Sequence, residues 1–219
     1  MSFVPDGSAP GLFGVYPAVV TDIVDPDSLG RVEVRFPWLT TEGDRDARYW
    51  ARLCSPYADD DQGLQIMPSV GSEVVVAFEA GNLRRPYVIG STWNGTTTLP
   101  RTPQSANDLR VLRTRSGSEI EFDDTDGAEK VTVSTASGHK VVLDNSAQEV
   151  LVAHSAGCTV KLTPTAVEVN ANVSVDVTAP MVNVDAAVST FNGVVKATTF
   201  IADVGVVSPS YTPGVGNVW

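Results

Sequence analysis

A run of strict two-residue alternation in the C-terminal half most constrains how this chain folds. Over residues 167–179 every odd position is valine or alanine, and the even positions carry Glu, Asn, Asn, Ser, Asp and Thr. A period of two is typical of a β-strand with one covered face, because successive side chains point to opposite sides of the strand. The sequence therefore predicts strands across this stretch.

Similar segments fill the chain from Leu109 onward. Glycine or proline marks the turns between them, as expected of a repetitive β architecture. Each segment predicts one strand and one turn. The segments are SEIEFDDTDG, AEKVTVSTASG, HKVVLDNSAQ, EVLVAHSAG, CTVKLTPT, AVEVNAN, VSVDVTAP and MVNVDAA.

These segments are too short for a solenoid built by one chain, whose coils need about 20 residues each. One strand per layer leaves an apolar face and strand edges open, and such surfaces aggregate unless they are covered. We expect copies of the same chain to cover them, three around one axis, with two-fold face-to-face packing as the alternative. The predicted trimer-core residues are Ile120, Phe122, Val131, Val133, Val167, Val169, Val173, Val175, Val177, Val182 and Val184.

The N-terminal half has a different composition. Trp38, Trp50 and Trp93 all lie before residue 95, among short β-branched runs punctuated by proline and glycine. Five short strands without a helical pattern predict a small OB-like barrel. The candidate strands are residues 14–23, 31–36, 49–53, 73–78 and 86–91. The Thr- and Pro-rich stretch that follows predicts a linker.

Charge and composition exclude several classes of function. The formal net charge of −11 argues against nucleic acid as a partner, because binding phosphates requires a basic surface. No apolar run reaches the roughly 20 residues that span a bilayer, and the first residues lack the features of a signal peptide. We therefore expect a chain assembled in the bacterial cytoplasm without a signal peptide.

Candidate chemical residues are few and scattered. Cys54 and Cys158 are isolated and predict inert thiols, and His139 and His154 have no readable catalytic or metal-ligand spacing. Three aspartates at 59–61 and the Asp-Gly turn at 126–127 are best explained as solvated loops, since neither run has the other ligands that a metal site needs. We expect no catalytic residue, no metal and no cofactor.

Three blocks of sequence carry a resemblance to a known family. LGRVEVRFPWL (residues 29–39), WARLCSPYA (50–58) and PSVGSEVVVAFEAGNLRRPYVIGSTWNG (68–95) closely resemble baseplate-V and VgrG-type spike proteins of contractile injection systems. The resemblance implies an all-β chain, with an N-terminal OB-fold barrel followed by an intertwined trimeric β-helix, or needle. The expected parts are an OB-fold collar at 1–94, a linker at 95–107, the β-helix at 108–207 and a C-terminal tip segment at 208–219.

Departures from the family pattern give further expectations. The chain begins close to its first barrel strand, so we expect the baseplate hub to be a separate protein on the OB-fold side. The short linker leaves no room for a lysozyme domain, and no HxH metal site occurs near the C-terminus. We expect the tip segment to dock a separate PAAR-like protein instead. The predicted docking residues are Tyr211, Pro213, Val218 and Trp219.

The resemblance implies a non-catalytic, cell-puncturing spike at the tip of a contractile machine, acting on a target cell envelope. The particle would be a phage tail or an extracellular phage-tail-like particle, and the sequence does not distinguish a phage from a bacteriocin or a bacterial injection system. Two alternatives stay open. One is an OB-fold protein that binds nucleic acid or carbohydrate, and the other is a trimeric β-helical adhesin or enzyme that acts on polysaccharide.

Overall fold

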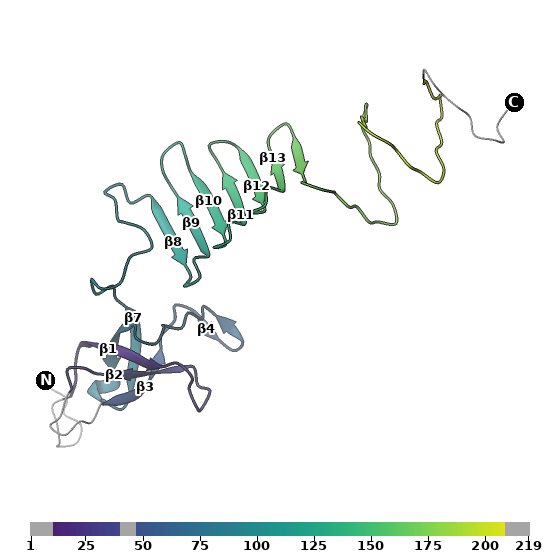
Figure 1. Ribbon diagram of the computed structural model, residues 1–219. Helices are drawn as coiled ribbons and strands as arrows, with labels where there is room; N and C mark the ends of the chain where they lie inside the picture. The colour runs from purple at the N-terminus through teal and green to yellow at the C-terminus, as the bar shows by residue number, and fades with distance from the viewer. Residues whose placement is uncertain (1–10, 40–46, 209–219) are drawn as a thin grey trace. The chain divides into compact units, whose positions relative to one another are not determined.

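The computed structural model describes residues 11–39 and 47–208 and shows an all-β chain with one short 3-10 turn at Glu79–Gly81 (Figure 1). Its strands form a closed barrel, a two-stranded hairpin and a seven-stranded sheet. The predicted docking residues Tyr211, Pro213, Val218 and Trp219 lie outside the described residues. Among the residues described, no helix is long and apolar enough to cross a membrane.

The barrel confirms the predicted OB-fold. Its strand order is β1-β2-β3-β7-β6, closed by pairing of β1 with β6. Strands β3 and β7 pair parallel, and the other neighbours pair antiparallel. The observed bounds agree with the expected ones to within one residue. They are β1 Val15–Asp22, β2 Arg31–Arg35, β3 Arg48–Leu53, β6 Glu73–Phe78 and β7 Pro86–Ser91.

Alternating side chains of these strands fill the barrel. In β2 and β6 every second residue is buried, as the valine spacing of RVEVR and EVVVAF predicts. Aromatic rings close the core around Phe36, whose ring centroid lies 5.4 Å from that of Phe78 and 5.6 Å from that of Trp38. This core is complete within one chain, so the barrel has the requirements of an independently folded domain.

A short hairpin follows β3. It consists of β4 (Ala58–Asp59) and β5 (Gln62–Gly63), which pair antiparallel. The hydroxyl of Tyr57 donates to the side-chain oxygen of Gln62 at 2.6 Å, and Ser55 Oγ donates to the carbonyl of Leu64 at 2.8 Å. These bonds fix the hairpin although its side chains are exposed.

The C-terminal half forms a seven-stranded antiparallel meander, called the ladder below (Figure 1). Consecutive strands are neighbours throughout, so each layer is one strand and one turn, as the sequence predicts. The strands are β8 Leu109–Arg113, β9 Glu119–Asp123, β10 Lys130–Ser134, β11 Lys140–Asp144, β12 Glu149–Ala153, β13 Thr159–Leu162 and β14 Val167–Asn170.

Three turns of one design stack along one edge of the ladder. In each turn the first residue and the fifth share a backbone hydrogen bond, and the fourth is a glycine with φ of 89°, 92° or 100°. Other residues are strained in this left-handed region, which explains the recurring glycine. A Cβ added to Gly117 would lie 3.6 Å from Ala136, in the next turn of the stack. The turns span residues 114–118, 135–139 and 154–158.

The strands of a single chain end at Asn170. Residues 171–208 contain no strand, whereas the alternation over 167–179 and the segment MVNVDAA after it predicted strands there. The physical reason is the absence of a pairing partner within the chain, since alternation specifies a face but supplies no hydrogen bonds. Residues from Val173 onward form a separate structural unit. The extension of the β-helix to residue 207 stays a prediction.

Candidate subunit interface

One face of the ladder is apolar across all seven strands. Two rows of directly paired residues cross it, one near each edge. The first row is Leu112, Ile120, Val133, Val141, Val152, Val160 and Val169. The second row begins at Arg110 and continues with Phe122, Val131, Leu143, Val150, Leu162 and Val167. We call these two rows the apolar face.

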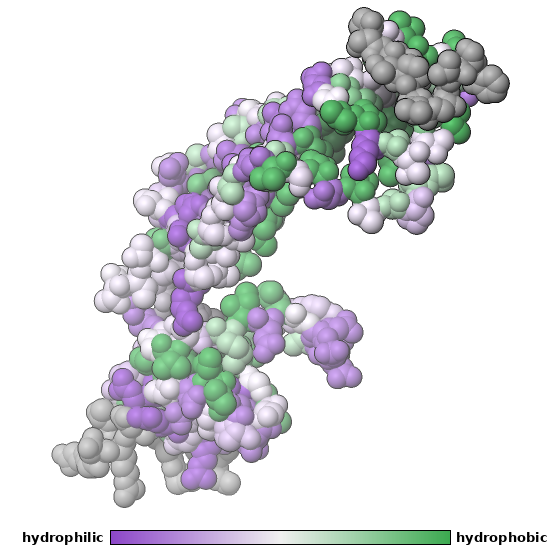
Figure 2. All heavy atoms as spheres, turned by 45° about the vertical axis from the view of Figure 1, so that its right-hand side comes forward, coloured by the Kyte–Doolittle hydropathy of each residue, from purple (hydrophilic) through white to green (hydrophobic). Residues whose placement is uncertain are grey.

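Among the residues that the structure describes, none buries the apolar face. Every fully buried hydrophobic side chain among the described residues belongs to the barrel, and none belongs to the ladder. Phe122 is 47% exposed, Leu143 49% and Val152 46%, although each lies in the middle of a paired strand. Space-filling spheres show apolar side chains gathered along one side of the ladder (Figure 2). A continuous apolar surface of this kind marks an interaction site.

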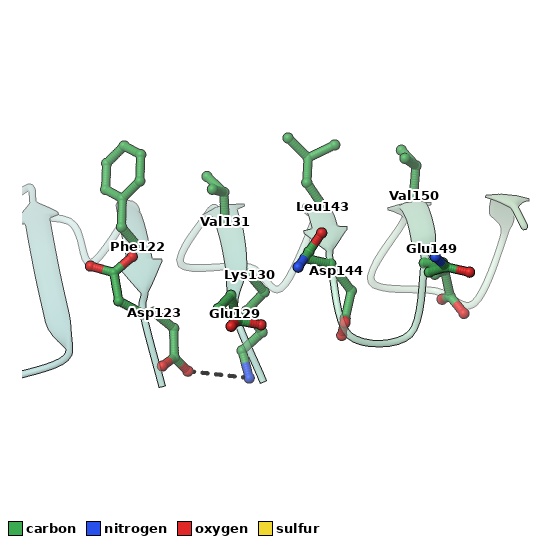
Figure 3. Close-up of a pocket in the computed structure, with 12 residues that line it drawn as sticks. Phe122, Asp123, Glu129, Lys130, Val131, Leu143, Asp144, Glu149 and Val150 are labelled. Carbon is green, nitrogen blue, oxygen red and sulfur yellow. Dashed lines mark ion pairs between the residues drawn. The ribbon is translucent and has the colours of Figure 1, made fainter. Parts of the chain in front are cut away.

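The opposite face of the ladder carries most of its charged side chains, several of them paired within the chain, together with Val111, Val142 and Leu151. Figure 3 shows Phe122, Val131 and Leu143 pointing to one side of the sheet, and Asp123 and Lys130 to the other. Lys130 Nζ lies 3.4 Å from Asp123 Oδ2, and farther along the ladder Lys161 pairs with Glu149 at 2.6 Å. The Glu149 pair raises the pKa of the Lys161 amine. Since these charges have partners in the same chain, this face is suited to solvent.

Carboxylates also order the turns at the other edge. Asp123 Oδ1 accepts hydrogen bonds from the hydroxyl and the N–H of Thr125, at 2.6 and 3.1 Å, and these bonds lower the pKa of Asp123. Asp144 accepts the N–H of Ala147 at 2.7 Å and the hydroxyl of Ser146 at 2.9 Å, which lowers its pKa in the same way. The acidic residues of this edge therefore hold turns, as expected for solvated loops.

The segment before the ladder is attached to the charged face by Arg101. Its Nη2 lies 2.8 Å from Glu119 Oε1, and its Nε donates to Glu121 Oε2 at 2.8 Å. Hydrogen bonding to Glu119 raises the pKa of the Arg101 guanidinium. Both carboxylates are largely covered, with side-chain exposures of 17% and 18%. The linker is thus fastened to the first strands of the ladder.

Beyond the ladder, apolar side chains lie almost wholly in the open. Val173 is 96% exposed, Val194 97% and Val204 102%, and no described hydrophobic residue after Asn170 is less than half exposed. In β8 to β13 neighbouring strands shield the large apolar side chains, none of which is more than 52% exposed, whereas Val167 of the edge strand β14 is 69% exposed. The segment after Asn170 therefore lacks both a core and a sheet of its own.

The structure treats the predicted trimer-core residues in two ways. Six of them lie together on the apolar face, which the period-two reading anticipated. They are Ile120, Phe122, Val131, Val133, Val167 and Val169. The other five lie in the strand-free segment and share no face within one chain. They are Val173, Val175, Val177, Val182 and Val184. The role of all eleven residues in a trimer core stays a prediction.

Sequence reasoning missed two clusters. Arg101 meets Glu119 and Glu121 across about 20 residues of chain, so no local pattern announces the contact. His139 and His154, to which no role was assigned, lie in adjacent turns with ring centroids 4.3 Å apart and ring planes tilted by 45°. Both Nδ1 atoms accept backbone N–H bonds. In the described part of the chain no three His, Cys, Asp or Glu side chains could hold a metal together.

Comparison with known protein families places both halves. Residues 16–93 match the type VI secretion system/phage-baseplate injector OB domain. Residues 110–173 match the phage baseplate V C-terminal trimerisation domain. The second match spans the ladder and ends where the strand-free segment begins, so the apolar face coincides with a domain known for trimerisation.

Several curated proteins are similar to this chain. The type VI secretion system spike protein VgrG3 of Vibrio cholerae is 28% identical over 57% of the chain and 13% of its own length. The spike protein VgrG1a of Pseudomonas aeruginosa is 26% identical over 66% of the chain and 24% of its own length. The actin cross-linking toxin VgrG1 of Vibrio cholerae is 29% identical over 54% of the chain. The chain thus spans less than a quarter of the length of these relatives.

Proposed function

Since the chain belongs to the baseplate-V and VgrG family of spike proteins, we propose that it is the cell-puncturing spike at the tip of a contractile injection machine, working mechanically and without catalysis. The observation that carries this proposal is the apolar face, an exposed two-row surface across seven paired strands. A partner matches the apolar face along its whole length when its own apolar side chains repeat at the spacing of the strands. A second and third copy of the same chain have that spacing.

The trimerisation domain supports a homotrimer, and the ladder's geometry fits one. Three sheets, each with its apolar face inward, enclose a triangular core of valine, leucine, isoleucine and phenylalanine. Their charged faces, with ion pairs already made in each chain, then meet the solvent. A two-fold pair of sheets would also cover the apolar face, and this is the alternative that a mass measurement excludes or establishes.

Mechanical load is the property that such a shaft provides. Strands of the ladder run across the stacking direction, so their hydrogen bonds point along it, with about 4.8 Å between successive strands. A compressive force along the shaft therefore acts on stacked strands that are joined by backbone hydrogen bonds, and not on a flexible connection. Separating three packed chains requires many contacts to break together, which gives slow unfolding and kinetic stability.

The intertwined needle belongs to this proposal as well. Residues 171–179 continue the valine-rich alternation, and neither they nor residues 180–207 form a strand within one chain. We infer that each chain there pairs its backbone with the two neighbouring chains, giving the intertwined β-helix. The side chains of Val173, Val175, Val177, Val182 and Val184 would then point to its axis.

The partners are proposed from the family. A separate hub on the side of the OB-fold barrel would pass the force of sheath contraction to the shaft, and a PAAR-like protein would cap the tip through Tyr211, Pro213, Val218 and Trp219. The proposed particle is a phage tail or a phage-tail-like particle that acts on a cell envelope. The actin cross-linking named for one relative gives no reason to assign an activity to this chain.

The test is the native mass and shape of the purified chain, by light scattering coupled to size exclusion and by small-angle scattering. The expected result is three times the 23.2 kDa of one chain and a rod-like profile. A dimer would establish the face-to-face alternative. A compact monomer would contradict the spike and favour a lone barrel that binds a ligand.

The tip partner has its own test. Deleting residues 208–219 should abolish co-purification of a tip protein while light scattering still reports a trimer. Binding that survives the deletion would overturn the docking proposal but leave the spike standing.

A further inference from the structure

Two exposed clusters of opposite charge lie on the barrel domain. One is a cleft lined by arginines and aromatic rings, called the arginine cleft. Its lining residues are Arg31, Trp50, Arg52, Glu79, Arg84, Arg85, Pro86 and Tyr87. The other is the hairpin of β4 and β5, whose tip carries three consecutive aspartates, and it is called the acidic hairpin. Neither cluster contributes to the apolar face of the ladder.

Aromatic rings hold two guanidinium groups of the arginine cleft in place. Arg31 Cζ lies 5.9 Å from the ring centroid of Trp50, and Arg52 Cζ lies 5.5 Å from that of Tyr87. Arg52 Nη1 also donates to the Tyr87 hydroxyl at 2.8 Å. A guanidinium fixed against a ring keeps its remaining N–H groups free in a defined geometry, which suits carboxylate recognition.

Half of the cleft's positive charge is already compensated in the chain. Arg31 pairs with Asp25 at 2.7 Å and Asp27 at 2.6 Å, and the hydrogen bond from Arg31 holds the pKa of Asp25 well below its usual range. Arg85 pairs with Glu79 at 2.8 Å.

Arg52 and Arg84 differ from those two. Both are exposed, and neither forms an ion pair with any residue that the structure describes. The cleft therefore presents two cations without an ion pair beside two aromatic rings, and the Tyr87 hydroxyl links one of them, Arg52, to the Glu79 carboxylate. A partner with closely spaced carboxylates would match it.

The acidic hairpin has the complementary character. Asp59, Asp60 and Asp61 are consecutive and exposed, and no cation pairs with them within 11–39 and 47–208. Three adjacent carboxylates repel one another, and a hairpin with two-residue strands is marginal when nothing covers it. Even so, its backbone and the Tyr57 side chain form an ordered set of hydrogen bonds. A cationic partner that binds the hairpin would stabilise this hydrogen-bonded conformation, because it would compensate the three carboxylates.

Three-fold symmetry supplies such a partner. Contacts around a three-fold axis join two different patches of the same chain, so a cyclic trimer needs two complementary surfaces on each subunit. We propose that the acidic hairpin of each chain docks in the arginine cleft of the neighbouring chain, so that the three barrels close into a ring. This inference rests on the homotrimer and not on the puncturing role.

The charges favour a second copy over a polyanion such as nucleic acid. Each chain brings one hairpin and one cleft, so three chains satisfy all three pairs with none left over. A nucleic acid in the cleft would leave the three aspartates uncompensated, on a chain whose formal net charge is −11. A separate acidic protein would leave the hairpin unpaired as well.

Disulfide trapping tests the proposed contact in the full-length trimer. In a Cys54→Ser, Cys158→Ser background, Asp60→Cys and Arg84→Cys are introduced together and oxidised mildly, after light scattering has verified the trimer. The expected product on a non-reducing gel is a covalent ring of three chains, absent from either single-cysteine variant. The matched control joins Asp60→Cys with Arg115→Cys, an exposed arginine in a ladder turn, and should give no covalent trimer.

Uncross-linked monomers, or a bond within one chain, from a verified trimer would overturn the ring. Adding Asp59→Lys and Asp61→Lys to the double-cysteine chain should lower the yield of covalent trimer several-fold, and an unchanged yield would overturn charge-driven docking.

Hydrogen exchange of residues 57–64 in the unaltered trimer provides a check without substitutions. Protection of these amides is expected, and free exchange would contradict the contact. An added oligonucleotide or acidic protein should compete with the hairpin for the arginine cleft. Loss of amide protection in residues 57–64 only when such a competitor is present would support docking of the hairpin in the cleft of a neighbouring chain.

Discussion

The ladder and the segment that follows it have similar sequences but different structures. Over residues 109–170 each chain pairs its own backbone in a seven-stranded meander, and only one face is left uncovered. In the segment that follows, the alternation continues to residue 179, yet residues 173–208 contain neither a strand nor a covered side chain. The difference lies in the turns. Three stacked glycine turns return the chain onto itself along one edge of the ladder, and among the described residues no turn with this hydrogen bonding follows residue 158.

This comparison separates two needs that a pattern of alternating residues does not distinguish. The ladder requires other chains only to cover apolar side chains, so contacts between chains there are packing contacts. The later segment also requires partners for its backbone N–H and C=O groups, since buried groups without partners are strongly disfavoured. We therefore expect the two regions to respond differently to the same perturbations.

The largest effect should come from a charge placed on the apolar face. Val152→Asp sets a carboxylate between Val141 and Val160, in the middle of the first row. In the trimer three such carboxylates would face one core, and an uncompensated buried charge destabilises by about 3–5 kcal/mol. Light scattering should show loss of the trimer, whereas circular dichroism should still report the barrel's strands.

Lys140→Asp is the matched control. Lys140 is exposed and lies on the opposite face of the same sheet, so the same carboxylate there should leave the trimer intact. A trimer that survives Val152→Asp as well as Lys140→Asp would show that the apolar face is not the contact between chains.

A smaller effect is expected from removing the strand-free segment. A chain that ends at Asn172 keeps the whole ladder and should remain a trimer. Its unfolding in denaturant should be at least about tenfold faster, because the cooperative pairing between chains is gone. The rate is measured by stopped-flow fluorescence, and a chain lacking only residues 208–219 serves as control. Equal unfolding rates for the full chain and the Asn172 truncation would mean that residues 173–207 make no pairing between chains.

The fold of the barrel followed from the sequence because its signals are local. Each strand has its own alternation and its own flanking turn residues, as in RVEVR and EVVVAF, and the barrel's core is completed within the chain. The ladder was predictable for the same reason. Its rows are the sum of one period-two pattern per strand, so Leu112, Val141, Val152 and Val160 follow from the rule that gave Ile120 and Val133.

Other features could not be read from the sequence. Strand signals over 171–179 give the face of each residue but not the chain that supplies its hydrogen bonds, so the end of the ladder at Asn170 was not foreseen. The arginine cleft combines residues from β2, β3 and the turn before β7, which only the closure of the barrel brings together. The contact of Arg101 with Glu119 and Glu121 depends on the path of an irregular segment.

A modest effect should follow from releasing that segment. Arg101→Ala removes two ion pairs from the charged face and leaves Glu119 and Glu121 to repel each other. Because Arg101 is about one-third exposed, the expected loss is about 1 kcal/mol per chain, read as a shift of the denaturant midpoint. Arg115→Ala, at an exposed arginine of a ladder turn away from the apolar face, should change the midpoint by less. A larger shift for Arg115→Ala than for Arg101→Ala would contradict the attachment of the linker to the ladder by Arg101.

The smallest effect is expected from acid, and it should arise outside the strand-free segment, in the ladder turns and at the paired carboxylates of the barrel. Hydrogen bonds in the turns lower the pKa values of Asp123 and Asp144 below the ordinary 3.8. A carboxyl with a lowered folded-state pKa stabilises the fold fully above its ordinary pKa and loses that contribution as the pH falls through the folded value. The denaturant midpoint should therefore be constant between about pH 7 and 5 and should fall below about pH 4, to the same degree in the full chain and in the Asn172 truncation. Thr125→Val removes the 2.6 Å hydroxyl bond to Asp123 and should make the fall shallower. If the denaturant midpoint fell in acid for the full chain but not for the Asn172 truncation, the titrating carboxyls would lie in the strand-free segment and not in the ladder or the barrel.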